Sequence, residues 1–314
     1  MTNKFQAWLY AFRLRTLPLA LSSIITGSSL AFADNREHFN WLVFGLLITT
    51  TLLLQILSNL ANDYGDSEKG TDNDERIGPK RAVQAGLLSF DEIKRGIFIC
   101  VTLCLISGSA LVTEATKGMN LGYGIFFFLL GLAAIAAAIK YTVGKSAYGY
   151  RGLGDVFVLL FFGLVGVCGS YYLLSHKLNP WILLPATTIG LFATGVLNLN
   201  NMRDCESDAK AGKITVVVKM GLAKAKRYQT ALIVLGFILS ITYGVITLLA
   251  DKEGKFSTMV FTFILTLPLF RKHLVAVRRI EKPAEFDPLL KQLAMWTFIF
   301  SILFAVGVIV GSVT

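Results

Sequence analysis

Two clusters of aspartate and asparagine residues stand out in this chain, and each directly follows a long apolar run. The first cluster spans residues 59–72 and the second spans residues 198–208. Carboxylates and amides so close to hydrocarbon are costly unless they bind something. Two clusters of the same form, far apart in the sequence, therefore predict one shared site that binds a metal ion and a polyanion.

The spacing within the clusters fits a row of oxygen ligands on a helix. Asn62 and Asp66 are four residues apart, as are Asp204 and Asp208, and residues at i and i+4 share a helix face. The three histidines lie outside both clusters, and oxygen ligands without imidazole or thiolate favour Mg²⁺ or Mn²⁺ over zinc. Because proteins usually hold Mg²⁺ with one or two carboxylates plus substrate phosphates, we expect a diphosphate bridged by Mg²⁺ between the clusters.

Basic side chains near the clusters would complete such a site, since Arg and Lys bind phosphate oxygens. The candidates are Arg76, Lys80, Arg81, Lys145, Arg151, Arg203 and Lys213. A single Asp or Asn at a helix end is often only a cap, but two matched clusters favour a common site. Tyr64, Tyr141 and Tyr148 either line an aromatic pocket or belong to an interfacial belt.

The composition is that of an integral membrane protein. Of the 314 residues 54% are hydrophobic and only 16% are charged, the mean hydropathy is +0.62, and soluble proteins carry roughly 25% charged residues. The apolar runs are long and do not alternate, so we expect helices and no β-barrel. The predicted architecture is a single all-α domain, residues 1–314, with nine transmembrane helices near 17–33, 41–61, 96–113, 121–139, 154–174, 180–200, 229–250, 256–270 and 293–312.

Charge predicts the orientation of these spans. With nine spans, 25 of the 30 Lys and Arg residues fall on the side that holds the N-terminus and both clusters. Such a bias marks the cytoplasmic side, so we expect a cytoplasmic N-terminus and a site that faces the cytoplasm. The same bias explains the net charge of +10 without nucleic acid as a partner. The loops 62–95 and 201–228 are long enough to fold as cytoplasmic caps.

A membrane-embedded diphosphate site suits one kind of lipid substrate. Polyprenyl diphosphates combine an anionic head with an apolar chain that the membrane can accommodate. Mg²⁺ together with Lys and Arg would stabilise the leaving diphosphate. The resulting allylic cation must be kept from water until an electron-rich partner captures it.

Several motifs of the chain resemble those of the UbiA superfamily of intramembrane prenyltransferases. They are Asn59 to Asp66 with Asp72, Arg76-Ile77-Gly78-Pro79, Tyr141-Thr142-Val143-Gly144, Tyr148 to Asp155, and Asn200 to Asp204 with Asp208. The resemblance implies nine transmembrane helices and two aspartate-rich motifs on the cytoplasmic side. The segments 148–155 and 200–204 are similar to the branch that prenylates 1,4-dihydroxy-2-naphthoate in the bacterial cytoplasmic membrane.

The resemblance also implies roles for individual residues. The implied metal ligands are Asn62, Asp66, Asp72, Asp204 and Asp208. The implied catalytic residues are Asp66, Asp204, Asp208 and Lys145. The implied substrate-binding residues are Asn62, Asp63, Asn201, Arg203, Arg151, Lys213, Tyr141 and Tyr148.

For this branch the implied reaction transfers a polyprenyl group from its diphosphate to 1,4-dihydroxy-2-naphthoate. Carbon dioxide and diphosphate are released, and the product is demethylmenaquinol, the precursor of menaquinone. Two other functions stay open: the same chemistry on another acceptor such as 4-hydroxybenzoate or homogentisate, and a cation-coupled transporter that uses the aspartates as ion sites. A transporter predicts acidic residues near the middle of the spans, and the sequence places both clusters at one membrane face.

Overall fold

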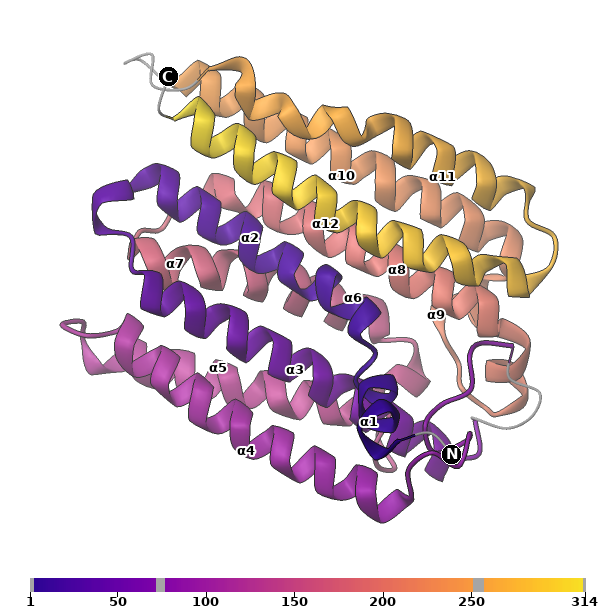
Figure 1. Ribbon diagram of the computed structural model, residues 1–314. Helices are drawn as coiled ribbons and strands as arrows, with labels where there is room; N and C mark the ends of the chain where they lie inside the picture. Colours follow the sequence, from indigo (N-terminus) through magenta and orange to yellow (C-terminus); the bar gives the residue numbers. More distant parts are fainter. Residues whose placement is uncertain (1–2, 72–76, 251–256, 313–314) are drawn as a thin grey trace.

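Nine helical segments long and apolar enough to cross a membrane occur in the residues that the structure, a computed structural model, describes: 3–71, 77–250 and 257–312. Most of them run side by side along one common direction (Figure 1). The described residues contain no strand, so the predicted all-α membrane fold with nine spans is confirmed. The helices that build the spans are α2 (Leu17–Asp34), α3 (Trp41–Glu68), α4 (Phe90–Ala115), α5 (Leu121–Lys140), α6 (Gly154–Val158), α7 (Gly169–Ser175), α8 (Leu183–Lys210), α10 (Leu222–Ala250), α11 (Leu267–Arg279) and α12 (Phe286–Gly311).

Several helices extend beyond the apolar runs that predicted them. Helix α3 continues to Glu68 and α8 to Lys210, so residues 59–68 of the first cluster and the whole second cluster are helical. Helix α10 already begins at Leu222, and a 3₁₀ segment at Thr258–Thr266 leads into α11, which ends at Arg279. Helical hydrogen bonding satisfies the backbone of these polar ends near the membrane face. Pro268 lies in the first turn of α11, where a missing N–H costs nothing.

Helix α8 forms the centre of one half of the bundle. It packs against α10, α12 and the π-helical segment Leu159–Cys168 that joins α6 to α7. Four buried rings, Phe192, Phe237, Phe270 and Phe300, meet in this core, with ring centroids 4.8 Å apart for Phe192 and Phe270. The packing places the polar end of α8 inside protein and away from lipid.

Two glycines let α8 and the π-helical segment approach closely. A Cβ atom on Gly163 would lie 2.6 Å from the carbonyl oxygen of Ala186, and one on Gly190 would lie 2.8 Å from that of Leu159. These distances are shorter than any van der Waals contact, so only glycine permits the crossing. Small residues at helix crossings are typical of membrane proteins.

We therefore expect Gly163→Ala to destabilise the protein by about 1–3 kcal/mol, the usual cost of overpacking. Thermal unfolding of the purified protein in detergent measures the effect. Gly131→Ala is the matched control, because a Cβ atom there meets nothing within 4 Å. Equal unfolding temperatures for the two variants would contradict the close crossing.

Candidate functional site

The first cluster lies in the last turns of α3 and faces the inside of the bundle. Asp66 is buried, and its Oδ1 accepts a hydrogen bond of 2.8 Å from the hydroxyl of Tyr150. Arg81 brings its Nη2 to 4.0 Å from the other carboxylate oxygen. One turn earlier, the amide oxygen of Asn62 accepts a hydrogen bond of 3.3 Å from the hydroxyl of Thr142. The four-residue spacing thus places Asn62 and Asp66 on one inward face, as predicted.

Asp63 points away from this face and organises the following loop. Its carboxylate accepts hydrogen bonds from the backbone N–H groups of Ala82 at 2.9 Å and Val83 at 3.4 Å. Those two bonds fix the segment that carries Arg81. The structure therefore gives Asp63, predicted to bind substrate, a role in holding the loop.

The second cluster lies at the end of α8, where Asp204 is paired with its neighbour. The Nε and Nη2 atoms of Arg203 contact the two oxygens of Asp204 at 2.8 and 2.6 Å. Arg203 also donates a hydrogen bond of 2.6 Å to Asp287, in the first turn of α12, and is itself buried. Arg203 thus joins α8 to α12 and compensates the charge of Asp204.

Asp287 was not predicted as part of the site, and we expect it to stabilise this junction. Asp287→Asn removes the charge that faces a buried guanidinium, so the protein should lose about 1–3 kcal/mol of stability. The apparent unfolding temperature in detergent measures this loss. Lys291→Met serves as the control, because Lys291 contacts the same carboxylate at 2.7 Å from the exposed side, where ion pairs contribute little.

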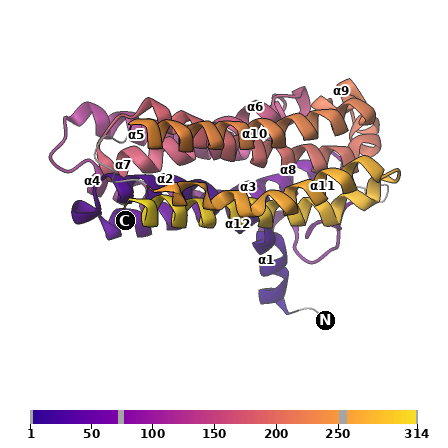
Figure 2. The same ribbon diagram turned by 90° about the horizontal axis from the view of Figure 1, so that it is seen from above.

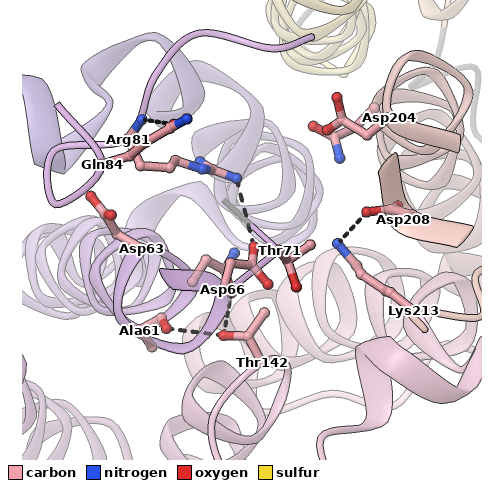
Figure 3. A network of polar contacts seen from close by, with 12 residues as sticks. Ala61, Asp63, Asp66, Thr71, Arg81, Gln84, Thr142, Asp204, Asp208 and Lys213 are labelled. Carbon is pink, nitrogen blue, oxygen red and sulfur yellow. Dashed lines mark hydrogen bonds and ion pairs between the residues drawn. The ribbon is translucent and has the colours of Figure 1, made fainter. Parts of the chain in front are cut away.

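Lys213 lies between the two clusters and is paired with Asp208 of the second (Figure 3). The Nζ of Lys213 is 3.3 Å from Oδ1 of Asp208, and both side chains are buried. The other carboxylate oxygen of Asp208 is buried without a hydrogen-bond partner, as is the amide oxygen of Asn201, which lies two turns earlier on the same face of α8. Buried oxygens without partners are rare in proteins, and they are available to a ligand.

Tyr150 connects the first cluster with Lys213. Its hydroxyl contacts both Asp66 and, at 2.6 Å, the hydroxyl of Thr71. The Nζ of Lys69 lies 3.9 Å from the centre of its ring and that of Lys213 lies 5.6 Å from it. Two cations near one aromatic ring form cation–π contacts. The position of Tyr150 within the segment 148–155 was the available signal.

Two of the predicted residues that the structure describes are not brought into this cluster. Lys145 and Arg151 are exposed, and the described residues show no contact of their side chains with either aspartate cluster. Asp72, a predicted metal ligand, lies outside the described residues.

An apolar cavity of about 360 Å³ begins at the first cluster. Asn62, Tyr141 and Tyr148 line one end of it, and Leu111 and Leu173 line the other. Tyr148 donates a hydrogen bond of 2.9 Å to the carbonyl of Ala137, which fixes its ring against Phe157. The cavity is therefore apolar along the membrane-spanning helices and reaches the first cluster at Asn62.

Burial and neighbouring charges determine the protonation states of Tyr141 and Lys213, which lie near the clusters and outside the membrane spans. Burial raises the pKa of Tyr141 to about 12, so its phenol stays protonated at neutral pH. Burial alone would lower the pKa of Lys213, but the carboxylates of Asp66 and Asp208 outweigh it and raise this pKa above its usual value. Lys213 is therefore a fixed positive charge between the clusters.

The oxygen groups of the two clusters fit a divalent cation that brings its own phosphate ligands. No three His, Cys, Asp or Glu side chains among the described residues are close enough to form a complete metal site. The unpartnered oxygens of Asp208 and Asn201, with the carboxylate of Asp66, offer the few ligands that Mg²⁺ takes from a protein when a substrate phosphate supplies others. This chemistry suits an enzyme that binds a lipid with an anionic head.

Comparison with known proteins defines the family. The model of the UbiA prenyltransferase family matches residues 20–299, and the chain belongs to this family of membrane enzymes, whose members generally require a divalent metal ion. A solved structure with 19% sequence identity and a TM-score of 0.59 covers 98% of this chain and 99% of its own, and it shares the fold; its subject is digeranylgeranylglyceryl phosphate synthase.

Two bacterial relatives are similar over nearly the whole length. The 1,4-dihydroxy-2-naphthoate octaprenyltransferase of Haemophilus influenzae is 44% identical over 99% of this chain and 98% of its own length. The enzyme with the same name in Escherichia coli is 43% identical over 98% of this chain and 96% of its own.

Proposed function

We propose that this protein transfers a polyprenyl group from polyprenyl diphosphate to 1,4-dihydroxy-2-naphthoate, with Mg²⁺ as the metal ion. The products are demethylmenaquinol, carbon dioxide and diphosphate, and the reaction is a step of menaquinone biosynthesis. One observation carries the proposal: an apolar cavity of about 360 Å³ reaches Asn62, one helical turn before the buried carboxylate of Asp66. The two bacterial relatives support naphthoate as the acceptor.

In this proposal the two clusters bind the diphosphate head together with the metal. Asn62, Asp66, Asp204 and Asp208, with Asp72 outside the described residues, would hold Mg²⁺, while Asn201 supports the second cluster. When bound, Mg²⁺ neutralises charge that develops on the diphosphate as it leaves. Lys213 and Arg81 add fixed positive charge at the same place.

The apolar part of the site protects the reactive carbon. The bond between the first prenyl carbon and the diphosphate oxygen breaks, and its electron pair leaves with the diphosphate. The rings of Tyr141, Tyr148 and Phe157 border the cavity beside the site, so they exclude water from the allylic cation. A buried phenol such as Tyr141 also donates a hydrogen bond without acting as a base at neutral pH.

The acceptor completes the reaction through its own ring. The electron-rich carbon that carries the carboxylate attacks the allylic carbon and forms the new carbon–carbon bond. The bond to the carboxylate then breaks, and its electron pair returns to the ring as carbon dioxide leaves. No oxidant or reductant is consumed.

The proposal includes a position in the cell. We place the protein in the bacterial cytoplasmic membrane as one domain of nine spans, with the N-terminus and the site on the cytoplasmic side. The excess of Lys and Arg on that side supports this orientation.

An assay with carboxyl-labelled acceptor tests the proposed reaction. Purified protein receives a polyprenyl diphosphate, Mg²⁺ and labelled 1,4-dihydroxy-2-naphthoate, and we expect release of labelled carbon dioxide that stops when a chelator removes the metal. Parallel reactions contain 4-hydroxybenzoate or homogentisate. If one of these acceptors is prenylated and the naphthoate releases no labelled carbon dioxide, the proposed acceptor is wrong.

A further inference from the structure

The proposed mechanism gives no role to helix α1 (Lys4–Phe12), which precedes α2. It extends away from the bundle and runs across the direction of the long helices (Figure 2). Arg13 ends it in the left-handed conformation with φ of 49°, which redirects the chain into α2. Because the long helices cross the membrane, a helix that runs across them follows the membrane surface.

Exposed residues of α4 show the depth in the membrane at which α1 contacts the bundle. A Cβ atom on Gly96 would lie 2.7 Å from the ring of Trp8, so α1 packs directly on this glycine. On either side of Gly96 the exposed surface of α4 changes from Lys94 and Arg95 to Phe98 and Ile99. A change from charged to apolar exposed residues marks the boundary between lipid headgroups and hydrocarbon.

Three faces of α1 fit this position. Ala7 and Ala11 are buried against the bundle. A second face carries Phe5 and Leu9; Phe12, which follows with the same spacing, is half-buried and packs against the core of the bundle. Phe5 is 66% exposed, and such an apolar face on a short helix at the headgroup boundary is characteristic of helices that lie in the membrane interface.

The third face of α1 carries Gln6 and Tyr10, and Tyr10 contacts the loop that follows the first cluster. The hydroxyl of Tyr10 donates a hydrogen bond to the backbone carbonyl of Lys80. The next residue is Arg81, which reaches Asp66, and the N–H of Ala82 is bound by Asp63. The segment that delivers Arg81 is thus attached on one side to α3 and on the other to α1.

We propose that α1 is an interfacial anchor whose face of Phe5 and Leu9 inserts into the phospholipid bilayer, and that Tyr10 uses this anchor to position Arg81 at the site. The bilayer is the occupant because this face continues the lipid-facing surface of α4 at Gly96. Tyr10 is a positioning residue, since it acts on the site only through the backbone of Lys80.

The anchor is tested by spin labels on single cysteines in the full protein, reconstituted in vesicles of phosphatidylethanolamine and phosphatidylglycerol. Phe5→Cys and Gln6→Cys probe α1, while Phe98→Cys and Lys94→Cys give the lipid and water references on α4. Protein without an added cysteine corrects for labelling of the four native cysteines. We expect the label at position 5 to be relaxed by oxygen, as at 98, and the label at 6 by a water-soluble nickel reagent, as at 94. The proposed anchor would be contradicted if the labels at positions 5 and 6 both behave like the label at 94. It would also be contradicted if oxygen relaxes neither of them.

The link to the site is tested by Tyr10→Phe, and only this arm rests on the proposed function. Loss of one hydrogen bond should raise the KM for polyprenyl diphosphate about three- to tenfold and leave kcat and the label pattern unchanged. Tyr123→Phe at the opposite membrane face is the matched control. An unchanged KM in Tyr10→Phe would overturn the positioning role while the label result still decides the anchor. A fall in kcat with unchanged KM would also overturn it, because a general structural defect would be the cause.

Discussion

Replacing Asp208 by Asn should lower kcat/KM for polyprenyl diphosphate by about a hundred- to a thousandfold, the usual effect of removing one group that stabilises developing charge. One oxygen of Asp208 is buried without a partner, and the other lies 3.3 Å from Lys213. Asparagine keeps the shape of the side chain but removes the charge that binds a divalent cation. Initial rates over a range of Mg²⁺ concentrations, with Mn²⁺ binding followed by electron paramagnetic resonance, measure both consequences.

Asp66→Asn should behave similarly, because Asp66 faces the same site from α3 (Figure 3). Asp91→Asn is the control, since Asp91 is an exposed aspartate in the first turn of α4 and should leave the rate within about twofold, as expected for an exposed charge. Full activity and normal Mn²⁺ binding in both buried variants would show that the clusters are not the active site.

The location of the spans could be predicted because each needs a long apolar run, and this signal is local in the sequence. The ends of the helices could not be predicted this way. Helix α8 continues through Asp204 and Asp208 because other parts of the protein bury those side chains. A hydropathy profile assigns polar residues to loops, because it does not include their burial by neighbouring helices.

The candidate site was predictable to the extent that it rests on spacing. The pairs Asn62 with Asp66 and Asp204 with Asp208 share faces because four residues make about one turn. Contacts between distant segments left no such signal: Tyr150 reaches Asp66 over 84 positions, and Arg203 reaches Asp287 over the same separation. Likewise, only the fold shows that Asp63 binds backbone amides of the loop while Asp66 faces the site.

The paired charges explain how so many carboxylates remain buried before a ligand arrives. Asp204 has Arg203, Asp208 has Lys213, and Asp66 has Tyr150 with Arg81 close by. Burying a charge without a partner is strongly destabilising, so each cluster carries its own compensation. In the proposed reaction the same cations would face the diphosphate once the carboxylates bind the metal.

Lys213→Met tests this double role, because it should separate metal binding from turnover. Lys213 neutralises Asp208 and would neutralise the leaving diphosphate, so its loss should lower kcat/KM about a hundredfold. Without a competing cation beside Asp208, Mn²⁺ should bind more tightly than in the unsubstituted protein. Lys224→Met, at an exposed position of α10, controls for the loss of one positive charge at the same membrane face. If Mn²⁺ affinity and kcat/KM both fall in Lys213→Met, Lys213 maintains the structure of the site and does not compete with the metal. Its charge would then contribute to stability more than to the reaction.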